Sequence, residues 1–271
     1  MHSPLLIAQL TDPHLGTGPA FLGGRIDTER ALQHAVTHVA ALQPRPDLVL
    51  LTGDMTEHGR PDEYARVAAA LAPLDMPIYA VPGNHDDSHT ACTALPAYMP
   101  VAHDAPAGRC CYHIQLKGLH CVALDTSVPG HAHGVLDTQQ LAWLANTLQA
   151  CCGLPVLLFM HHPPLPSGIE AMDACSLLVG SEQLAALIRQ HARVQGILCG
   201  HLHRAVQMQF AGVPVHVAPS VAHQIALDLQ PGASLHAQLE PPQISLHRWT
   251  PLYGLCTHLS YVEPYGPAIA F

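Results

Sequence analysis

The chain has 271 residues, of which 49% are hydrophobic, and its formal net charge at pH 7 is -9. That length and hydrophobic share are enough for one large domain with a substantial core. The 11 Lys and Arg residues form no basic run, which argues against a nucleic-acid-binding surface.

The first part of the chain alternates strands and helices. Apolar runs predict three buried strands, at Leu5–Leu10, Asp47–Leu51 and Ile78–Val81. Between them, Asp27 is expected to cap a helix that stops before Pro44, and Pro61 begins a second helix. This alternation is typical of parallel βαβ units with right-handed crossovers.

The rest of the chain mixes strand directions. Two turns, at Lys117-Gly118 and Ala211-Gly212, predict hairpins, and Asp137 and Ser181 are each expected to cap a helix. The strands of these hairpins are predicted at 110–115 with 119–124 and at 206–210 with 213–217. Further strands are predicted at 155–160, 195–199, 244–249 and 255–261, and a loop at 230–242.

Five of the predicted strands end in Asp, Asn or His. Ligands of α/β sheets bind outside the carboxyl ends of the strands, so these side chains can converge although they are distant in sequence. The converging set is predicted to be Asp12, His14, Asp54, Asn84, His161, His201 and His203. Seven ligands exceed what one ion needs, so we predict two ions that share Asp54. Imidazole, carboxylate and amide groups suit Fe, Mn, Zn or Co.

Such a site favours a phosphate substrate. Its two carboxylates contribute roughly -2 against roughly +4 or +5 from two ions, so the site is positive inside a negative protein. We expect a metal-bridging hydroxide to attack the phosphorus. His85, which follows the ligand Asn84, is expected to protonate the leaving oxygen or to hold a phosphoryl oxygen.

The same residues resemble a known family. Five segments are similar, in order, to the five blocks of the calcineurin-like metallophosphoesterases: Asp12-x-His14, Gly53-Asp54, Gly83-Asn84-His85-Asp86, His161 and Gly200-His201-x-His203. The resemblance runs from residue 5 to about residue 225. It implies a four-layer α/β/β/α sandwich of two mixed sheets flanked by helices. It also implies two ligand sets that share Asp54: Asp12, His14, Asp54 and His203 on one metal, and Asp54, Asn84, His161 and His201 on the other.

Within that family the chain looks most like class III cyclic nucleotide phosphodiesterases and glycerophosphodiesterases, through segments 59–64, 124–131 and 160–164. The resemblance therefore implies a phosphodiesterase acting on 3′,5′- or 2′,3′-cyclic nucleotides, in which Asn84 and His85 are catalytic and contact the substrate. A glycerophosphodiester or broad-specificity phosphodiesterase is the alternative, and a repair nuclease and a non-catalytic scaffold are more distant ones. His223 is similar to a substrate-side histidine of the relatives. Arg25 is a further substrate candidate, and a structural role is the alternative for both.

Other residues near the motifs leave choices open. His162 is an alternative to its neighbour His161 as a ligand, because adjacent residues of an extended chain face opposite ways. His131 and His133 could form another metal pair, but no predicted strand end directs them to the cluster, so we assign them to a loop. Asp86 and Asp125 are expected to support ligands rather than to bind metal.

The remaining expectations concern the whole protein. We predict one metallophosphoesterase domain over 1–271, with 230–271 as a C-terminal cap or oligomerisation extension and with a dimer or larger homo-oligomer. The two ions are expected to be Fe and Mn, with Zn or Co as alternatives, and the partner a small-molecule phosphodiester. No apolar run approaches the ~20 residues of a membrane span. The nine cysteines include no C-x-x-C and indicate free thiols in the cytoplasm.

Overall fold

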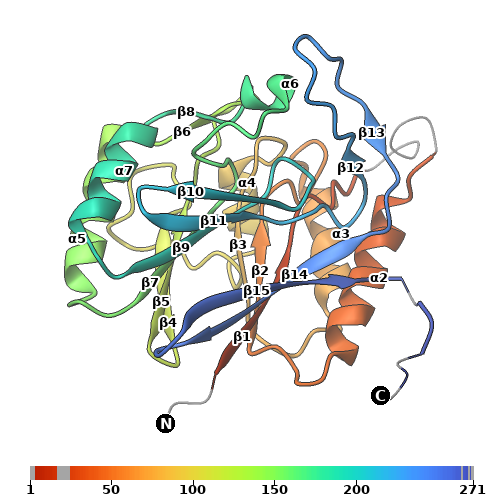
Figure 1. The fold of residues 1–271 in the computed structure, drawn as a ribbon, viewed down its shortest axis with the longest axis horizontal. Helices are drawn as coiled ribbons and strands as arrows, with labels where there is room; N and C mark the ends of the chain where they lie inside the picture. Colours follow the sequence, from red (N-terminus) through yellow and green to blue (C-terminus); the bar gives the residue numbers. More distant parts are fainter. Residues whose placement is uncertain (1–3, 17–24, 264, 268, 270–271) are drawn as a thin grey trace.

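Two mixed β-sheets lie face to face in the structure, a computed structural model that describes residues 4–16, 25–263, 265–267 and 269 (Figure 1). The first sheet has the strand order β15 (Gly254–Tyr261), β14 (Gln243–Thr250), β1 (Leu5–Leu10), β2 (Leu48–Thr52) and β3 (Ile78–Val81). Strands β1, β2 and β3 are parallel, while β14 and β15 are antiparallel to their neighbours. The second sheet has the order β10 (Val206–Phe210), β11 (Val213–Val217), β9 (Val194–Cys199), β7 (Val156–Met160), β5 (Leu119–Leu124) and β4 (Tyr112–Leu116).

Helices cover the outer face of each sheet. Helices α2 (Thr28–Ala41) and α3 (Pro61–Leu71) pack on the first sheet, and α5 (Thr138–Ala150) and α7 (Ser181–Gln190) pack on the second. Two shorter helices, α4 (Ser88–Ala94) and α6 (Glu170–Asp173), follow β3 and β7. Two small ladders pair β6 (Gly134–Val135) with β8 (Leu177–Val179), and β12 (Gln224–Ile225) with β13 (Ala237–Gln238). The predicted four-layer sandwich is confirmed.

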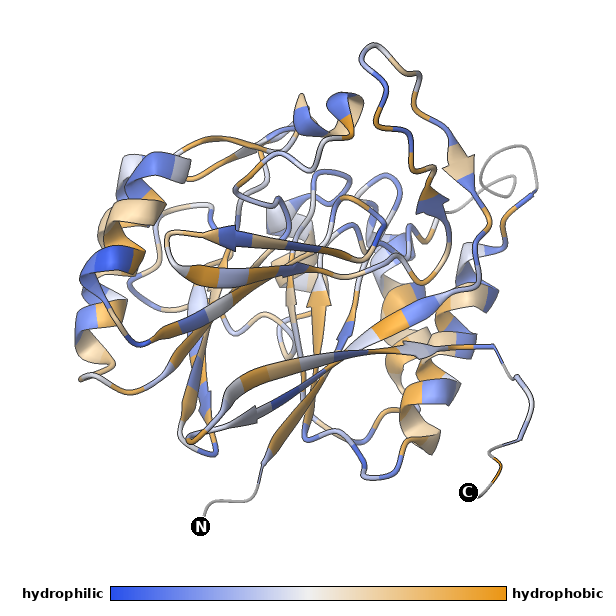
Figure 2. Cartoon of the chain, in the orientation of Figure 1, coloured by the Kyte–Doolittle hydropathy of each residue, from blue (hydrophilic) through white to orange (hydrophobic). Residues whose placement is uncertain are grey.

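The central strands are buried on both faces, and Figure 2 shows much of their length in the colour of hydrophobic residues. Strand β7 illustrates how each strand serves two cores. Its Leu157 and Phe159 belong to the core that also contains β1, β2 and β3, whereas Leu158 and Met160 pack with residues of α5 and α7. Side chains of a strand point alternately to opposite faces, so one apolar run fills both layers.

A buried polar contact also joins the two sheets. Gln9 of β1 donates from Nε2 to the Cys199 carbonyl at 2.8 Å and to the Thr52 hydroxyl at 2.9 Å. Its Oε1 faces His247 Nε2 at 2.9 Å, and the other ring nitrogen of His247 lies 2.8 Å from Thr257 Oγ1. Because each buried polar group here has a partner, the network fixes the sheets relative to each other at a modest cost in desolvation.

The helix caps agree with the sequence at two positions and differ at a third. Asp27 and Asp137 accept hydrogen bonds from the first-turn amides of α2 and α5, as predicted. Ser181, however, does not cap α7, because its hydroxyl donates to the Pro164 carbonyl at 2.8 Å. The cap is Gly180, with φ +89°, where a Cβ would lie 2.3 Å from a backbone oxygen of Leu136.

Most predicted strands are confirmed within two residues of their ends. The strand predicted from residue 110 begins at Tyr112, because the amide of Cys110 donates to the Asp125 carboxylate at 3.0 Å rather than to a strand. The predicted loop 230–242 contains the short strand β13. Strands β14 and β15 extend the first sheet, and the assignment of 230–271 as a cap or oligomerisation segment stays a prediction. No helix in the described ranges is long and apolar enough to cross a membrane.

Candidate metal centre

The seven predicted ligands lie together where β1, β2, β3, β7 and β9 end. Each of these residues lies within four positions of the last residue of its strand. Six of the seven are buried, and Asn84 is partly exposed. The strands thus converge as the sequence predicts.

One half of the site is formed by Asp12, His14, Asp54 and His203, whose ligand atoms all lie within 4.8 Å of one another. The Nε2 atoms of His14 and His203 are 3.1 Å apart. His14 Nε2 lies 3.6 Å from Asp54 Oδ2, and His203 Nε2 lies 3.4 Å from Asp12 Oδ1. These atoms can surround a single ion.

The protonation of the two rings shows why a cation fits here. His14 Nδ1 lies 2.8 Å from the Glu57 carboxylate, and His203 Nδ1 lies 3.0 Å from the His223 carbonyl. Both partners only accept hydrogen bonds, so each Nδ1 carries a proton and each Nε2 is the ring atom that faces the site. Two ring nitrogens and the carboxylates of Asp12 and Asp54 at these distances are stabilised by a positive charge between them.

The other half of the site is formed around Asn84. Its Oδ1 lies 3.2 Å from His161 Nε2 and 3.1 Å from His201 Nδ1. Asp54 Oδ2 lies 3.3 Å from the same His161 nitrogen, so this oxygen faces both halves. His161 Nδ1 donates to the Thr52 carbonyl at 2.8 Å, which directs Nε2 into the site. The arrangement suits two cations that share the Asp54 carboxylate.

The electrostatics also favour positive charge. Burial lowers the pKa of His161, but the Asp54 carboxylate raises it to about 9. Burial likewise raises the pKa of Asp54, but His161, His14 and His85 hold it well below its usual value. Asp54 is therefore ionised, and the pocket around it stabilises a cation, whether a proton or a metal.

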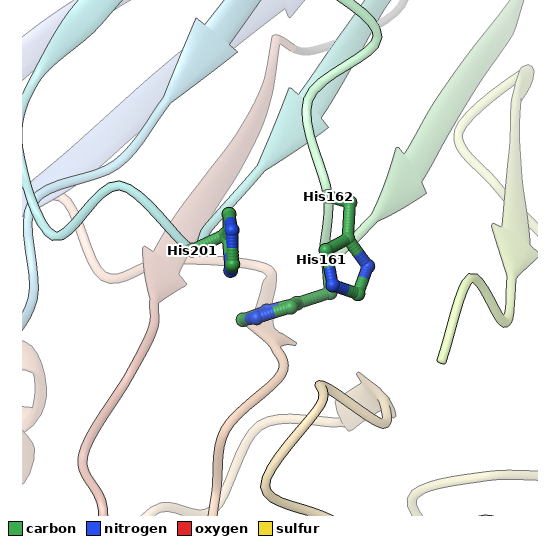
Figure 3. A group of neighbouring side chains, drawn as sticks. All are labelled: His161, His162 and His201. Carbon is green, nitrogen blue, oxygen red and sulfur yellow. The ribbon is translucent and has the colours of Figure 1, made fainter. Parts of the chain in front are cut away.

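His162 differs from His161 in its contacts. Figure 3 shows the rings of His161 and His162, which follow β7, gathered with that of His201, which follows β9. These three also form a possible metal-binding group. His162, however, bonds the Thr126 hydroxyl through Nδ1 at 2.7 Å and the Ala132 carbonyl through Nε2 at 3.1 Å. The ring of His162 thus contacts a hydroxyl and a backbone carbonyl, whereas His161 Nε2 faces Asp54 and Asn84, so the geometry favours His161 as the ligand.

Strained backbone is concentrated at the site. Eight non-glycine residues in the described part of the chain have positive φ, and five of them are predicted ligands: Asp12 (51°), His14 (48°), Asp54 (46°), His201 (72°) and His203 (54°). Such conformations are uncommon outside glycine and persist where the surrounding structure enforces them, often at functional sites.

Glycines of the motifs allow the loops to approach one another. A Cβ on Gly83 would lie 2.2 Å from Asp54 Oδ1, and a Cβ on Gly53 would lie 2.3 Å from His161 Nδ1. A Cβ on Gly200 would lie 2.1 Å from Thr11 Oγ1. The three glycines are needed because atoms of Asp54, His161 and Thr11 occupy the space that a Cβ would take.

Asp86 and Asp125 hold loops in place. Asp86 accepts hydrogen bonds from the amides of Met55, Thr56 and Gly83 at 3.0–3.1 Å, so it joins the loops that carry Asp54 and Asn84. Asp125 accepts from Ser88 and from the amide of Cys110. These contacts agree with supporting roles.

The substrate candidates occupy different places. The ring of His223 is centred 4.5 Å from that of His203, inside the site, and burial lowers its pKa to about 3. Arg25 is exposed and lines a separate pocket of about 390 Å³ with Val221 and Ala222. The rings of His131 and His133 are centred 5.1 Å apart and belong to none of the three-ligand groups found in the described ranges. Residues 17–24, which precede Arg25, lie outside the described residues.

One functional candidate was not singled out from the sequence. Glu57, three residues after Asp54, contacts both His14 and His85. The only signal for it in the sequence is an acidic residue shortly after a ligand, which by itself is common.

Comparison with known proteins identifies the family. The sequence matches the calcineurin-like phosphoesterases over residues 5–205, and the chain belongs to that family. It is 34% identical over 268 residues to a probable glycerophosphodiester phosphodiesterase GpdQ of Arcobacter nitrofigilis, which covers 97% of this chain and 96% of that one. It is 31% identical over 233 residues to a cAMP/cGMP dual specificity phosphodiesterase of Mycobacterium tuberculosis, which covers 84% of this chain and 71% of that one.

A solved structure supports the fold. A dimetal phosphatase from Danio rerio matches with a TM-score of 0.66 and 16% identity over 96% of this chain and 100% of that one. At this identity the likeness concerns the fold alone. Together with the family match and the clustered side chains, it establishes a calcineurin-like metallophosphoesterase with a dinuclear metal site of His and Asp ligands.

Proposed function

We propose that the chain is a metal-dependent phosphodiesterase in which Asp54 is shared between two cations. The observation that carries the proposal is the position of Asp54 Oδ2, 3.6 Å from His14 Nε2 and 3.3 Å from His161 Nε2. One cation would be held by Asp12, His14, Asp54 and His203, and the other by Asp54, Asn84, His161 and His201. When bound, two such cations lower the pKa of an attacking water and neutralise charge on the phosphoryl oxygens.

His85 is suited to act on the leaving group. Its Nδ1 lies 3.1 Å from the Glu57 carbonyl and therefore carries a proton, so Nε2 can donate to a substrate only when the ring is doubly protonated. Burial lowers the pKa of His85, but Asp54 and Glu57 raise it above its ordinary value. The side chain is 37% exposed, so a substrate can reach it. We assign His85 the transfer of a proton to the departing oxygen.

Asn84 and the backbone of His85 keep this geometry in place. The amide of His85 donates to Asp54 Oδ1 at 2.8 Å, which directs the other carboxylate oxygen towards the two halves of the site. Asn84 Oδ1 points to the same centre, and its amide group is then available to a phosphoryl oxygen of the substrate. In this scheme, the loop that carries Asn84 and His85 both orients the Asp54 carboxylate and contacts the substrate.

Cyclic nucleotides are our first choice of substrate. A cAMP/cGMP phosphodiesterase is 31% identical to this chain, and residues 59–64, 124–131 and 160–164 carry the same resemblance. A monoanionic diester also needs less positive charge than a dianionic monoester, and Arg25 lines a separate pocket. Glycerophosphodiesters are the second candidate, because the relative aligned over 97% of this chain is named for that activity.

For the identity of the metals, the cellular location and the oligomeric state, we propose what the sequence predicts. We propose Fe and Mn as the two metals, with Zn or Co as alternatives, since imidazole and carboxylate ligands suit all four. All nine cysteines are free thiols, which supports a cytoplasmic location. A homo-oligomer is proposed, with the end of the chain at the contact. Tyr253, Tyr265 and Ile269 are more than 70% exposed there.

Hydrolysis of bis(p-nitrophenyl) phosphate by the Mn²⁺-reconstituted protein tests the proposal. We expect turnover by the wild type, loss of it in Asp54→Ala, and wild-type activity in Asp62→Ala, an exposed acidic residue of α3. Full activity in Asp54→Ala would refute the shared carboxylate. A comparison of kcat/KM for 3′,5′-cAMP, 2′,3′-cAMP and glycerophosphocholine then decides between the two substrate classes.

A further inference from the structure

The side chain of Glu57 lies between a predicted metal ligand and the predicted proton donor. Its Oε2 is 2.8 Å from His14 Nδ1 and 3.7 Å from His85 Nδ1. Its backbone carbonyl is 3.1 Å from the same nitrogen of His85. The rings of His14 and His85 are themselves centred 4.7 Å apart, edge to face. Glu57 therefore contacts both the predicted metal ligand His14 and the predicted proton donor His85.

The backbone holds Glu57 against the loop of His14. The amide of Glu57 donates to the Leu15 carbonyl at 3.0 Å, and the amide of Leu15 donates to the Met55 carbonyl at 3.1 Å. Leu15 and Thr56 form an isolated parallel bridge. A side chain placed by such pairing loses little further freedom when it binds His14, so it can orient the ring.

This contact determines which ring nitrogen of His14 carries the proton and which one faces the metal site. A carboxylate accepts hydrogen bonds and cannot donate one, so Nδ1 of His14 carries the proton and Nε2 keeps its lone pair. That lone pair is the one 3.1 Å from His203 Nε2 and 3.6 Å from Asp54 Oδ2. Outer carboxylates of this kind make the imidazole a stronger ligand.

We propose that Glu57 is a positioning residue: its carboxylate fixes His14 as the Nδ1–H tautomer for the metal, and its backbone carbonyl orients His85. The inference rests on the proposed metal centre and assigns a residue that the five sequence motifs do not contain. Glu57 touches neither substrate nor metal in this scheme, and it acts through the two histidines.

A third metal ion is the main competing explanation. His14, Glu57 and His85 offer three ligand atoms within 4.8 Å of one another. An ion there would have to replace the proton of His14 Nδ1, and His14 would then bridge two metals as an anion. The 2.8 Å separation of Nδ1 and Oε2 is an ordinary hydrogen-bond length, and it favours the positioning role.

Histidine tautomers in the metal-free protein give a test that needs no activity. We would record ¹⁵N imidazole NMR spectra of the wild type, Glu57→Gln and Glu57→Ala, with Glu182→Gln as a control because Glu182 is exposed on α7. The wild type and the control should show His14 as the Nδ1–H form, and Glu57→Ala should lose that preference. The same tautomer in all four proteins would overturn the proposal.

Manganese affinity gives the second readout. In competition with a chelator, Glu57→Ala should weaken one of two Mn²⁺ sites by about 10- to 100-fold and leave the other unchanged, with Glu57→Gln in between. Three bound ions in the wild type and two in Glu57→Ala would overturn the positioning role. So would two sites in Glu57→Ala with the same Mn²⁺ affinities as in the wild type. If the tautomer and affinity shift but the wild type hydrolyses no diester, the proposed function fails and this inference stands.

Discussion

Substitution of Gly83 by alanine should disable the metal centre through one added methyl group. The new Cβ would lie 2.2 Å from Asp54 Oδ1 and 2.3 Å from the Asp54 amide nitrogen. Ordinary contacts begin at 3.4 Å, so the carboxylate and its backbone must move by about 1.2 Å. Misplacement of a catalytic group by about 1 Å costs about 10²-fold in rate, and Asp54 serves both halves of the site. We therefore expect kcat/KM to fall at least about 100-fold.

Steady-state hydrolysis of bis(p-nitrophenyl) phosphate at saturating Mn²⁺ measures this loss, and metal analysis and thermal unfolding show whether the variant binds ions and folds. Gly266→Ala is the matched control, because a Cβ there meets nothing within 4 Å. It should behave as the wild type. A Gly83→Ala variant with two bound metals and a kcat/KM within about twofold of the wild type would refute the close approach of the two loops.

Three further predictions concern histidines. His85→Gln should lower kcat by about 10²- to 10⁴-fold with metal content unchanged, as steady-state kinetics and metal analysis would show; a loss of metal instead would make His85 a ligand. His162→Asn should retain two Mn²⁺ ions, whereas His161→Asn should lose one, and the reverse result would exchange their roles. Burial lowers the pKa of His247 to about 3, so its neutral form contributes stability above pH 6.5 that is lost as the pH falls towards 3. Between pH 6.5 and 5 this loss is about 2 kcal/mol by urea unfolding. His247→Gln should remove it, and equal acid sensitivity of the two proteins would contradict the assignment.

The sequence predicts the strands and the ligand positions well because both depend on local pattern. The run Ile78–Val81 is apolar and short, and Gly83-Asn84 follows it after Pro82. The sequence therefore indicates the end of the strand and the position of the ligand together. Helix α4 was not predicted, since only Ala91 of its seven residues is buried and no apolar periodicity marks it. Pattern reasoning detects elements that bury a regular face and misses those that do not.

Contacts between distant loops could not be predicted in the same way. The position of Glu57 depends on the bridge between Leu15 and Thr56, and the nearby ligands His14 and Asp54 have positive φ. The contacts of His162 depend on the carbonyl of Ala132, thirty residues earlier. Such partners are set by tertiary structure, and a sequence gives only their residue types.

Crystals of the Mn²⁺-reconstituted protein, measured for anomalous scattering, test the central claim most directly. The account predicts two peaks about 3.5–4 Å apart, both within bonding distance of the Asp54 carboxylate. One peak should also contact His14 and His203, and the other His161 and His201. A single peak, or peaks away from Asp54, would contradict the dinuclear centre on which the proposed phosphodiesterase depends.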